Sequence, residues 1–478
     1  MTEQIITDSY SFLLNNKRFD LFIKFLFLEK RNLNPSFFKT LYLEHLKAFN
    51  NFNEDYGRKR GKVDFLNDFF LIKSSIERDG FDPKHGFIPI NLENQIIDGA
   101  HRLASCAYLN QSFIAEQRDC HVDYDYSFFQ KRNFPTYLAD YVAMEYVKHN
   151  PHAHIMELHA VNDIKFDEKV EQILSKYGFV YYKKNVYLSY NGYVSLKKIN
   201  YGTEFWNQDT FIGSFDNDFQ GAKDHATRSF GKNPLRVYVF VCDELDKVLE
   251  AKKEIRSIFN IGNHSVHIND THAEAIYLSE LLFNDNSIHF FNNSSYNLNQ
   301  SVISESIDKF KMDLNENNIN CDDVCLVGSL PLALYDLRET NDIDFVTLLD
   351  NIDEFDFSSV DLHKDYHYFE NDISDIIYNP QYYFYYKGLK IITLDTLYKY
   401  KKNRNEYPKD MNDCLLIESF NSNGFALRNR IRWRKIRIEL KLFCKHPLKY
   451  CFYKIKSSLA KIKCLRQLWI KIREFKNK

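Results

Sequence analysis

The chain has 478 residues, of which 44% are hydrophobic, and its formal net charge is −2. This length exceeds what one hydrophobic core supports, so we expect two to four domains. No segment approaches the roughly 20 apolar residues of a membrane-spanning helix, and no secretory signal peptide is expected from the first residues. The nine scattered cysteines favour reduced cytoplasmic thiols over a disulfide framework.

Residues 1–80 predict helices, because Phe, Leu and Ile recur at helical spacing in 19–27 and again in 37–49. Residues 86–110 then predict a strand at 87–92, a turn, a strand at 96–98 and a helix that opens at Gly99.

The joint between the second of these strands and the helix carries a candidate phosphate site formed by Asp98, Gly99, His101 and Arg102. Gly99 lets the backbone approach a ligand closely, and the start of a helix offers unpaired N–H groups. Arg102 can bind a phosphate through two parallel hydrogen bonds, and His101 can shuttle a proton or bind a phosphate oxygen. Asp98 can orient His101 or bind Mg²⁺. The alternative is a structural joint with a capping Asp and a hydrogen-bonded His.

The run Gly99-Ala100-His101-Arg102 resembles the Gly-x-His-Arg box of the ParB/sulfiredoxin superfamily, and the resemblance covers residues 60–125. That superfamily includes CTP-binding segregation proteins, sulfiredoxins and small-molecule kinases. The resemblance implies that this turn holds the phosphates of a nucleotide. Because no clear helix-turn-helix array follows, nucleotide binding or phosphotransfer fits better than DNA segregation.

The middle region predicts alternating strands and helices: strands at 236–241, 264–268 and 287–291, and helices at 245–259 and 271–283. This order indicates a domain with a parallel sheet, in which ligands bind at the carboxyl ends of the strands.

Polar residues follow the second strand of this region. A zinc or manganese site is one interpretation, capping of the next helix by Asp270 or Thr271 is another, and binding of a phosphorylated substrate by His267 or His272 is a third. The residues concerned are His264, His267, Asp270, His272 and Glu274.

The segment 328–345 reads GSLPLALYDLRETNDIDF and lies between two apolar, β-prone stretches. Its order is strand, Gly-Ser turn, short helix and a strand with alternate carboxylates. Asp342 and Asp344 therefore project from one face. Two adjacent carboxylates favour a hard cation such as Mg²⁺. Phosphate oxygens usually complete the coordination shell of this ion. Gly328 permits close approach of a phosphate, and Ser329 adds a hydroxyl at a helix start. The alternative is a surface strand with two solvated acids.

This segment resembles the nucleotidyltransferase superfamily of the polymerase-β type, over roughly residues 300–420. The resemblance implies that Asp342 and Asp344 hold Mg²⁺ (or Mn²⁺) against a nucleoside triphosphate. It also implies a third acid on a neighbouring strand, for which Asp361 is favoured over Asp375. A domain without the third acid would bind a nucleotide without transferring it. The resemblance places Gly328, Ser329 and Arg338 beside the nucleotide.

Residues 383–415 predict a strand at 390–393 and a basic helix, followed by Pro408 and Lys409. Many small nucleotidyltransferases close with a similar helix and a Lys-Asp pair, which makes Lys409 or Arg404 a candidate triphosphate contact. A solvated amphipathic helix with a Pro-initiated successor is the alternative.

The tail at 428–478 contains 18 Lys and Arg but two acids, a net charge of +16, so the preceding 427 residues carry −18. Its apolar residues recur at three- and four-residue spacing with Trp469 among them, which predicts a basic amphipathic helix. We expect it to bind an anionic membrane surface, ahead of nucleic acid or the chain's own acidic body. Such tails resemble those of bacterial enzymes of capsule and lipopolysaccharide assembly.

The chain is therefore expected to be an α/β (α+β) multidomain enzyme. We expect a helical lead with a ParB/sulfiredoxin-like domain (1–125), a middle α/β domain with a parallel sheet (126–295), a nucleotidyltransferase-like domain (300–420) and the tail (428–478). The predicted function is metal-dependent nucleotidyl or phosphoryl transfer to a small molecule or glycan precursor at the inner membrane of a bacterium. The alternatives are a nucleic-acid-associated protein and a non-catalytic nucleotide sensor.

Overall fold

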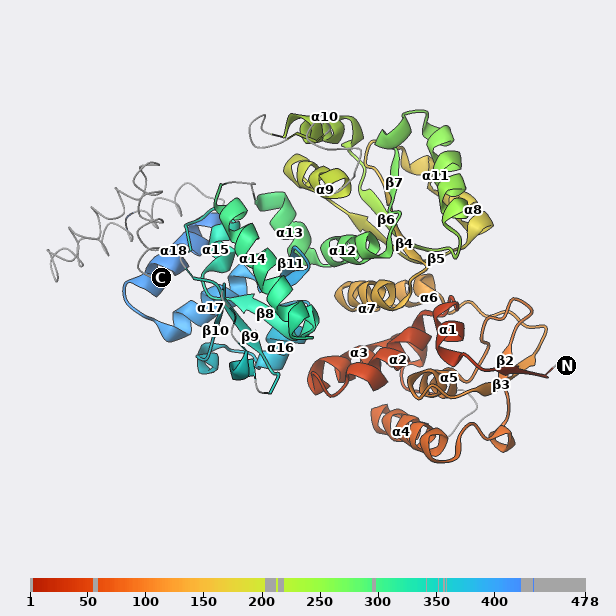
Figure 1. The fold of residues 1–478 in the computed structure, drawn as a ribbon. Coiled ribbons are helices and arrows are strands. Elements are labelled where there is room, and N and C mark those ends of the chain that lie inside the picture. Colours follow the sequence, from red (N-terminus) through yellow and green to blue (C-terminus); the bar gives the residue numbers. More distant parts are fainter. Residues whose placement is uncertain are drawn as a thin grey trace. The chain divides into compact units, whose positions relative to one another are not determined.

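The computed structural model describes residues 3–54, 59–202, 212–213, 219–294, 298–340, 342–350, 352–355, 357, 359–422 and 433 (Figure 1). The chain forms two compact units. The first comprises Met1–Asp336, Thr340–Lys364 and Asn371–Thr393, and the second Leu337–Glu339, Asp365–Glu370 and Leu394–Lys478. Apart from Trp433, the basic tail lies outside the described residues, so its amphipathic helix stays a prediction.

The first 80 residues fold mainly into helices, which confirms the prediction from helical spacing. Ten of the twelve residues of α2 are buried, as expected for a helix that is apolar on every side. Asn34 caps α3 by accepting a hydrogen bond from the Phe37 N–H, with Pro35 in the first turn. The helices are α1 (Ser9–Leu14), α2 (Phe19–Lys30), α3 (Pro35–Asn50) and α4 (Lys62–Asp79).

A three-stranded sheet accompanies these helices, with β1 (Glu3–Ile6), β2 (Ile88–Ile90) and β3 (Phe113–Gln117) in the order β1-β3-β2. Strand β3 runs antiparallel to β1 and parallel to β2. The helix α5 (Ala100–Tyr108) makes the crossover between β2 and β3. Helices α6 (Tyr126–Gln130) and α7 (Thr136–His149) follow.

The middle region contains a four-stranded sheet whose neighbouring strands are all antiparallel, so the predicted parallel sheet is wrong. Its order is β5 (Phe179–Val186), β6 (Leu235–Val241), β4 (Ala153–Leu158) and β7 (Val266–Ile268). Strand β4, which comes earlier in the chain, lies between β6 and β7. The predicted strand at 287–291 is instead part of helix α13 (Asp285–Asn293), which Asn284 caps.

The two faces of this sheet differ in character. Helices α8 (Asp167–Tyr177) and α11 (Leu245–Phe259) contribute Val170, Leu174, Val248 and Ile255 to an apolar core against one face. Helix α9 (Tyr190–Gly202) places polar side chains against the alternate residues of β4, and α10 (Gln220–Ser229) lies beside it. Figure 1 shows the two helix pairs on either side of the sheet, with α12 (His272–Leu282) nearby.

A five-stranded mixed sheet completes the first unit, in the order β10-β9-β8-β12-β11. Its strands are β8 (Val324–Val327), β9 (Asp344–Thr347), β10 (Asp361–Leu362), β11 (Tyr383–Tyr386) and β12 (Leu389–Ile392), and its helices are α14 (Leu298–Glu316), α15 (Leu330–Leu334) and α16 (Ile373–Tyr378). The second unit contains α17 (Leu394–Arg404) and α18 (Lys409–Asn421). None of the helices in the described ranges combines the length and apolar character of a bilayer span.

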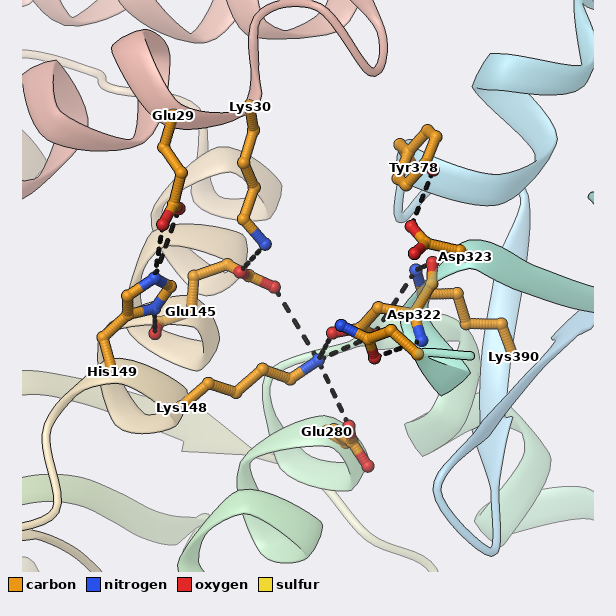
Figure 2. Close-up of polar contacts among 11 residues, drawn as sticks. Glu29, Lys30, Glu145, Lys148, His149, Glu280, Asp322, Asp323, Tyr378 and Lys390 are labelled. Atoms are coloured by element: carbon orange, nitrogen blue, oxygen red, sulfur yellow. Dashed lines mark hydrogen bonds and ion pairs between the residues drawn. The ribbon is translucent and has the colours of Figure 1, made fainter. Parts of the chain in front are cut away.

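A buried network of charges centres on Lys148 of α7 (Figure 2). The Lys148 Nζ lies 2.8 Å from Asp322 and 3.3 Å from Glu280. Burial opposes ionisation of Asp322, but Lys148 and Lys390 outweigh it and hold the Asp322 pKa well below its ordinary value. Lys30 of α2 forms an ion pair with Glu145, which lies on α7 one turn before Lys148. The network therefore joins elements from residue 30 to residue 390 within the first unit.

Replacing Lys148 by Met should destabilise the protein by about 3 kcal/mol, the lower end of the cost of breaking a buried pair, because Asp322 and Glu145 would lose their central cation and keep only Lys390 and Lys30. Chemical denaturation measures the free energy of unfolding. The matched control is Lys47→Met, at an exposed helical pair with Glu44, where we expect a loss below about 0.5 kcal/mol. Equal effects of the two substitutions would contradict the role assigned to Lys148.

Burial raises the pKa of Glu280 from 4.5 to about 7. The folded state therefore keeps a proton that the unfolded chain loses, and folding stability falls as the pH rises from about 4.5 to about 7. The variant Glu280→Gln lacks this proton, so its stability relative to wild type should increase across that window. Denaturant midpoints at several pH values measure the difference. If the stability difference between Glu280→Gln and wild type did not change with pH, the raised pKa of Glu280 would be contradicted.

Candidate functional site

The turn after β8 brings the backbone against a carboxylate. Gly328 has φ +70°, and a Cβ atom there would lie 2.3 Å from the Oδ2 atom of Asp344. Both facts require glycine: the left-handed backbone disfavours other residues, and any side chain would displace the carboxylate. The contact arises because β8 and β9 are antiparallel, with Val327 paired to Asp344.

Asp361 lies beside Asp344. Strands β9 and β10 are parallel, Asp344 and Asp361 are register partners, and the Asp361 N–H donates to the Ile343 carbonyl at 2.9 Å. Neighbours in register lie on the same face of a sheet, about 4.8 Å apart between strands. Asp342 precedes Asp344 by two residues and is exposed, as is Asp361. Asp344 and Asp361 thus lie side by side on neighbouring strands, and Asp342 lies two residues before Asp344 in the chain.

The alternative third acid, Asp375, lies elsewhere. It belongs to α16, and its carboxylate accepts a hydrogen bond from the Asn34 side chain at 2.8 Å. The geometry therefore distinguishes the two candidates that the sequence left open, and Asp361 is the one on the neighbouring strand.

Ser329 takes part in a chain of hydroxyl groups. Its Oγ lies 2.7 Å from the Oγ1 of Thr340, which donates to the Asp342 carbonyl at 2.8 Å. Because the Thr340 proton is used on the carbonyl, Ser329 donates to Thr340. The chain ties the Gly-Ser turn to the residues that carry the acids. Sequence reasoning assigned no role to Thr340, although its place two residues before Asp342 is the signal.

Arg338 and Lys409 belong to the second unit. The Arg338 guanidinium forms a two-pronged ion pair with Asp413, with Nε–Oδ1 and Nη2–Oδ2 distances of 2.7 and 3.0 Å. Lys401 lies 3.1 Å from both Asp413 and Asp410. Lys409 is exposed at the first position of α18. In the described structure the Arg338 side chain therefore binds the Asp413 carboxylate of α18.

The acid residues suit Mg²⁺ by their chemistry. Mg²⁺ is bound in proteins through one or two carboxylates, with phosphates and water as the other ligands. Asp344 and Asp361 supply such a pair. Among the described residues, no group of three or more His, Cys, Asp or Glu side chains is placed to hold a metal by itself. A site here would therefore depend on ligands from a bound phosphate.

The amino-terminal box has a different local structure. Gly99 caps α5 with φ +84°. The Arg102 guanidinium donates to the carbonyls of His85, Gly86 and Phe87 at 3.2, 2.6 and 3.2 Å. In the described state this arginine therefore holds the turn before β2, and a phosphate would have to compete with three backbone acceptors.

His101 contacts an aromatic pocket rather than the turn. Its Nε2 lies 2.9 Å from the Tyr42 hydroxyl, and its ring centroid is 4.6 Å from that of Phe69. Burial holds the pKa of His101 well below its ordinary value, so the imidazole is neutral at pH 7. Asp98 is exposed one residue before Gly99.

The histidines of the middle region are dispersed over several contacts. His267 lies 3.0 Å from Glu274, and His272 lies 2.7 Å from the Val147 carbonyl. Thr271 caps α12, and Asp270 forms an ion pair with Lys252 at 3.3 Å. These residues do not converge as metal ligands among the described parts of the chain. Capping by Thr271 is the interpretation that the structure confirms.

No protein-family model, curated protein or solved structure matches this chain. Its own residues therefore carry the functional argument.

Replacing Gly328 by Ala should destabilise the fold and weaken Mg²⁺ and nucleotide binding, because the new Cβ would displace the Asp344 carboxylate. The matched control is Gly388→Ala, where φ is +77° and the side-chain atom nearest to a Cβ, the Lys311 Nζ, is 3.4 Å away. Both variants should lose about 1 kcal/mol from backbone strain. Only Gly328→Ala should also lose metal-dependent nucleotide binding, measured by calorimetry. Equal binding by both variants would contradict the proposed contact.

Proposed function

We propose that the chain is a metal-dependent nucleotidyl- or phosphotransferase acting on a small molecule or glycan precursor. The observation that supports this most is the pairing of Asp344 with Asp361 on neighbouring parallel strands, with the glycine backbone of the preceding turn against Asp344. This arrangement agrees with the resemblance to polymerase-β-type nucleotidyltransferases.

In this proposal Asp342, Asp344 and Asp361 hold Mg²⁺, which when bound supplies charge neutralisation for a triphosphate. The hydroxyl chain from Ser329 through Thr340 fixes the backbone that carries Asp342. The absence of a Cβ at Gly328 lets this turn lie against the Asp344 carboxylate. Positioning and electrostatic stabilisation are the main requirements of phosphoryl and nucleotidyl transfer, and a rigid sheet edge meets the first of them.

The proposed cellular location is based on the composition of the basic tail. A segment of net charge +16 with interleaved Ile, Leu and Trp suits an anionic membrane surface. We therefore propose a peripheral location at the bacterial inner membrane and a role in surface-polysaccharide assembly. Asp98, Gly99, His101 and Arg102 remain a proposed second phosphate site, which requires Arg102 to exchange carbonyl partners for phosphate oxygens.

The test is incubation of the purified full chain with Mg²⁺ and nucleoside triphosphates labelled separately at the α- and γ-phosphates, with bacterial metabolites as acceptors. Transfer of the α-label with release of pyrophosphate is expected. It should fall at least 100-fold in Asp344→Asn and in Asp361→Asn, because each removes a metal-binding charge. Asp375→Asn, which alters the alternative acid on α16, should retain activity.

The other outcomes separate the remaining interpretations. Transfer of the γ-label that survives Asp344→Asn but not Arg102→Gln would move the chemistry to the amino-terminal box. Nucleotide binding without transfer of either label would favour the non-catalytic sensor. Unchanged α-transfer in the double variant of Asp344 and Asp361 would overturn the proposed site.

A further inference from the structure

A cavity of about 130 Å³ lies between α17 and α18 in the second unit. One wall is formed by Tyr398, Lys401, Lys402 and Asn405, which recur at three- and four-residue spacing along α17 and the residue after it. Residues at this spacing share one face of a helix. Residues of α18 between 410 and 418 form the other wall in the same manner. The cavity is therefore built by two facing helix stripes.

Contacts between the helices lie at both ends of the cavity. At one end the Tyr398 hydroxyl donates to Glu418 at 3.0 Å, and at the other Lys401 lies 3.1 Å from Asp410. An early residue of α17 thus contacts a late residue of α18, so the helices are antiparallel. The Asp410 carboxylate also accepts two hydrogen bonds from Arg404. The charged groups at this end are therefore satisfied by the chain itself.

Two polar side chains of the lining have no polar partner within the described part of the chain. The Lys402 ammonium has a contact with the Tyr398 ring, 5.9 Å from its centre, but no ion pair with a described carboxylate. The Asn405 amide makes no side-chain hydrogen bond to a described residue, and both side chains are exposed. Lys402 and Asn405 are three residues apart, or about one helical turn. An ammonium and an amide N–H can both donate to one carboxylate.

The inner part of the cavity is apolar. Leu415 is buried and Met411 and Cys414 are half-buried. Burial raises the pKa of the Cys414 thiol to about 11, so the thiol stays protonated at neutral pH and acts as a small apolar group. An apolar cavity of about 150 Å³ holds one benzene molecule, so this cavity is comparable in size to a single ring. The Tyr398 ring and the Met411 thioether both favour contact with an aromatic ring.

The charges of the lining also restrict the ligand. They comprise two cations and two acids: Lys401, Lys402, Asp410 and Glu418. Only Lys402 among these cations lacks an ion pair with a described carboxylate, so a monoanion balances the available charge. A phosphate dianion would exceed it and would face two acids in the same walls.

We infer that this cavity binds a small aromatic carboxylate. The ring would lie against Tyr398, Met411 and Leu415, and the carboxylate would accept hydrogen bonds from Lys402 and Asn405. This inference is independent of the chemistry proposed at Asp344, because every residue of the cavity belongs to the second unit.

The first test is ligand-observed NMR on the full wild-type chain with benzoate, benzamide, acetate and phenyl phosphate. Benzoate should bind at millimolar concentration. Benzamide keeps the ring without the charge, and acetate keeps the charge without the ring, so each should bind at least fivefold more weakly than benzoate. Absence of benzoate binding, equal binding of either analogue, or tighter binding of phenyl phosphate would overturn the inference.

A photoreactive analogue, 4-azidobenzoate, locates the site in the wild-type protein. Mass spectrometry of the digested protein should find the cross-link within residues 398–418, and excess benzoate should suppress it. Cross-links confined to other parts of the chain would overturn the inference and show adventitious binding only.

The variant Lys402→Met tests the charge at the rim. The Kd of benzoate should rise about fivefold, as expected for the loss of an exposed ion pair, while the Kd of benzamide should not change. The matched control is Lys399→Met on the same helix, where the ammonium pairs with Asp395 at 2.8 Å, and it should bind benzoate as wild type does. Unchanged benzoate binding by Lys402→Met would overturn the proposed contact.

Discussion

The ion pair between Lys148 and Asp322 is the interaction on which the arrangement of the first unit depends. Their side chains are 13% and 25% exposed, and they lie 174 residues apart in the chain. A charge pair removed from water is stabilising only when further hydrogen bonds and charges satisfy both partners. Lys390, which bonds to the Asp322 carbonyl at 2.7 Å, and Glu280 meet that condition. Because these groups come from α7, α12, β12 and the turn before β8, misplacing any one element would leave a buried charge unpaired.

The acidic edge of the five-stranded sheet also depends on the correct placement of neighbouring strands. Gly328 must be glycine so that β8 can end against Asp344, and β8 in turn pairs with β12, which carries Lys390. The position of Asp344 is thus set by a strand order that the buried charges help to fix. A catalytic carboxylate placed on a strand is held more rigidly than one on a loop. The exposed Asp361 is less constrained, since β10 is a short edge strand of two residues.

The sequence predicted local structure well where the signal was local. Helical spacing identified α2 and α3, and the pattern around 245–259 gave the bounds of α11. The Gly-Ser turn and alternate acids predicted the β8–β9 connection. It failed for strand order in the middle sheet, because no local pattern shows that β4 enters between β6 and β7. It also misread 287–291, where Asn284 as a helix cap was the missed signal.

The candidate site was predictable in part for the same reason. Asp342 and Asp344 share a strand-like segment, so their spacing alone places them together, whereas Asp361 depends on parallel pairing across 17 residues. Arg102 and Arg338 show the limit of residue type as a guide: a guanidinium suits phosphate, yet it also suits backbone carbonyls and a buried carboxylate. Arg102 binds three carbonyls and Arg338 binds Asp413. Only the three-dimensional partners distinguish these uses.

Buried polar groups among the described residues fall into two kinds. Around Lys148 and Lys401, each charge has opposite charges within about 4 Å, so the groups are satisfied by the chain itself. Around Glu157 the hydrogen bonds align α9 with β4 but leave two acceptors and one donor without partners among the described residues. The paired charges around Lys148 and Lys401 are explained by the need to fix strand and helix positions, because each charge removed from water requires a partner.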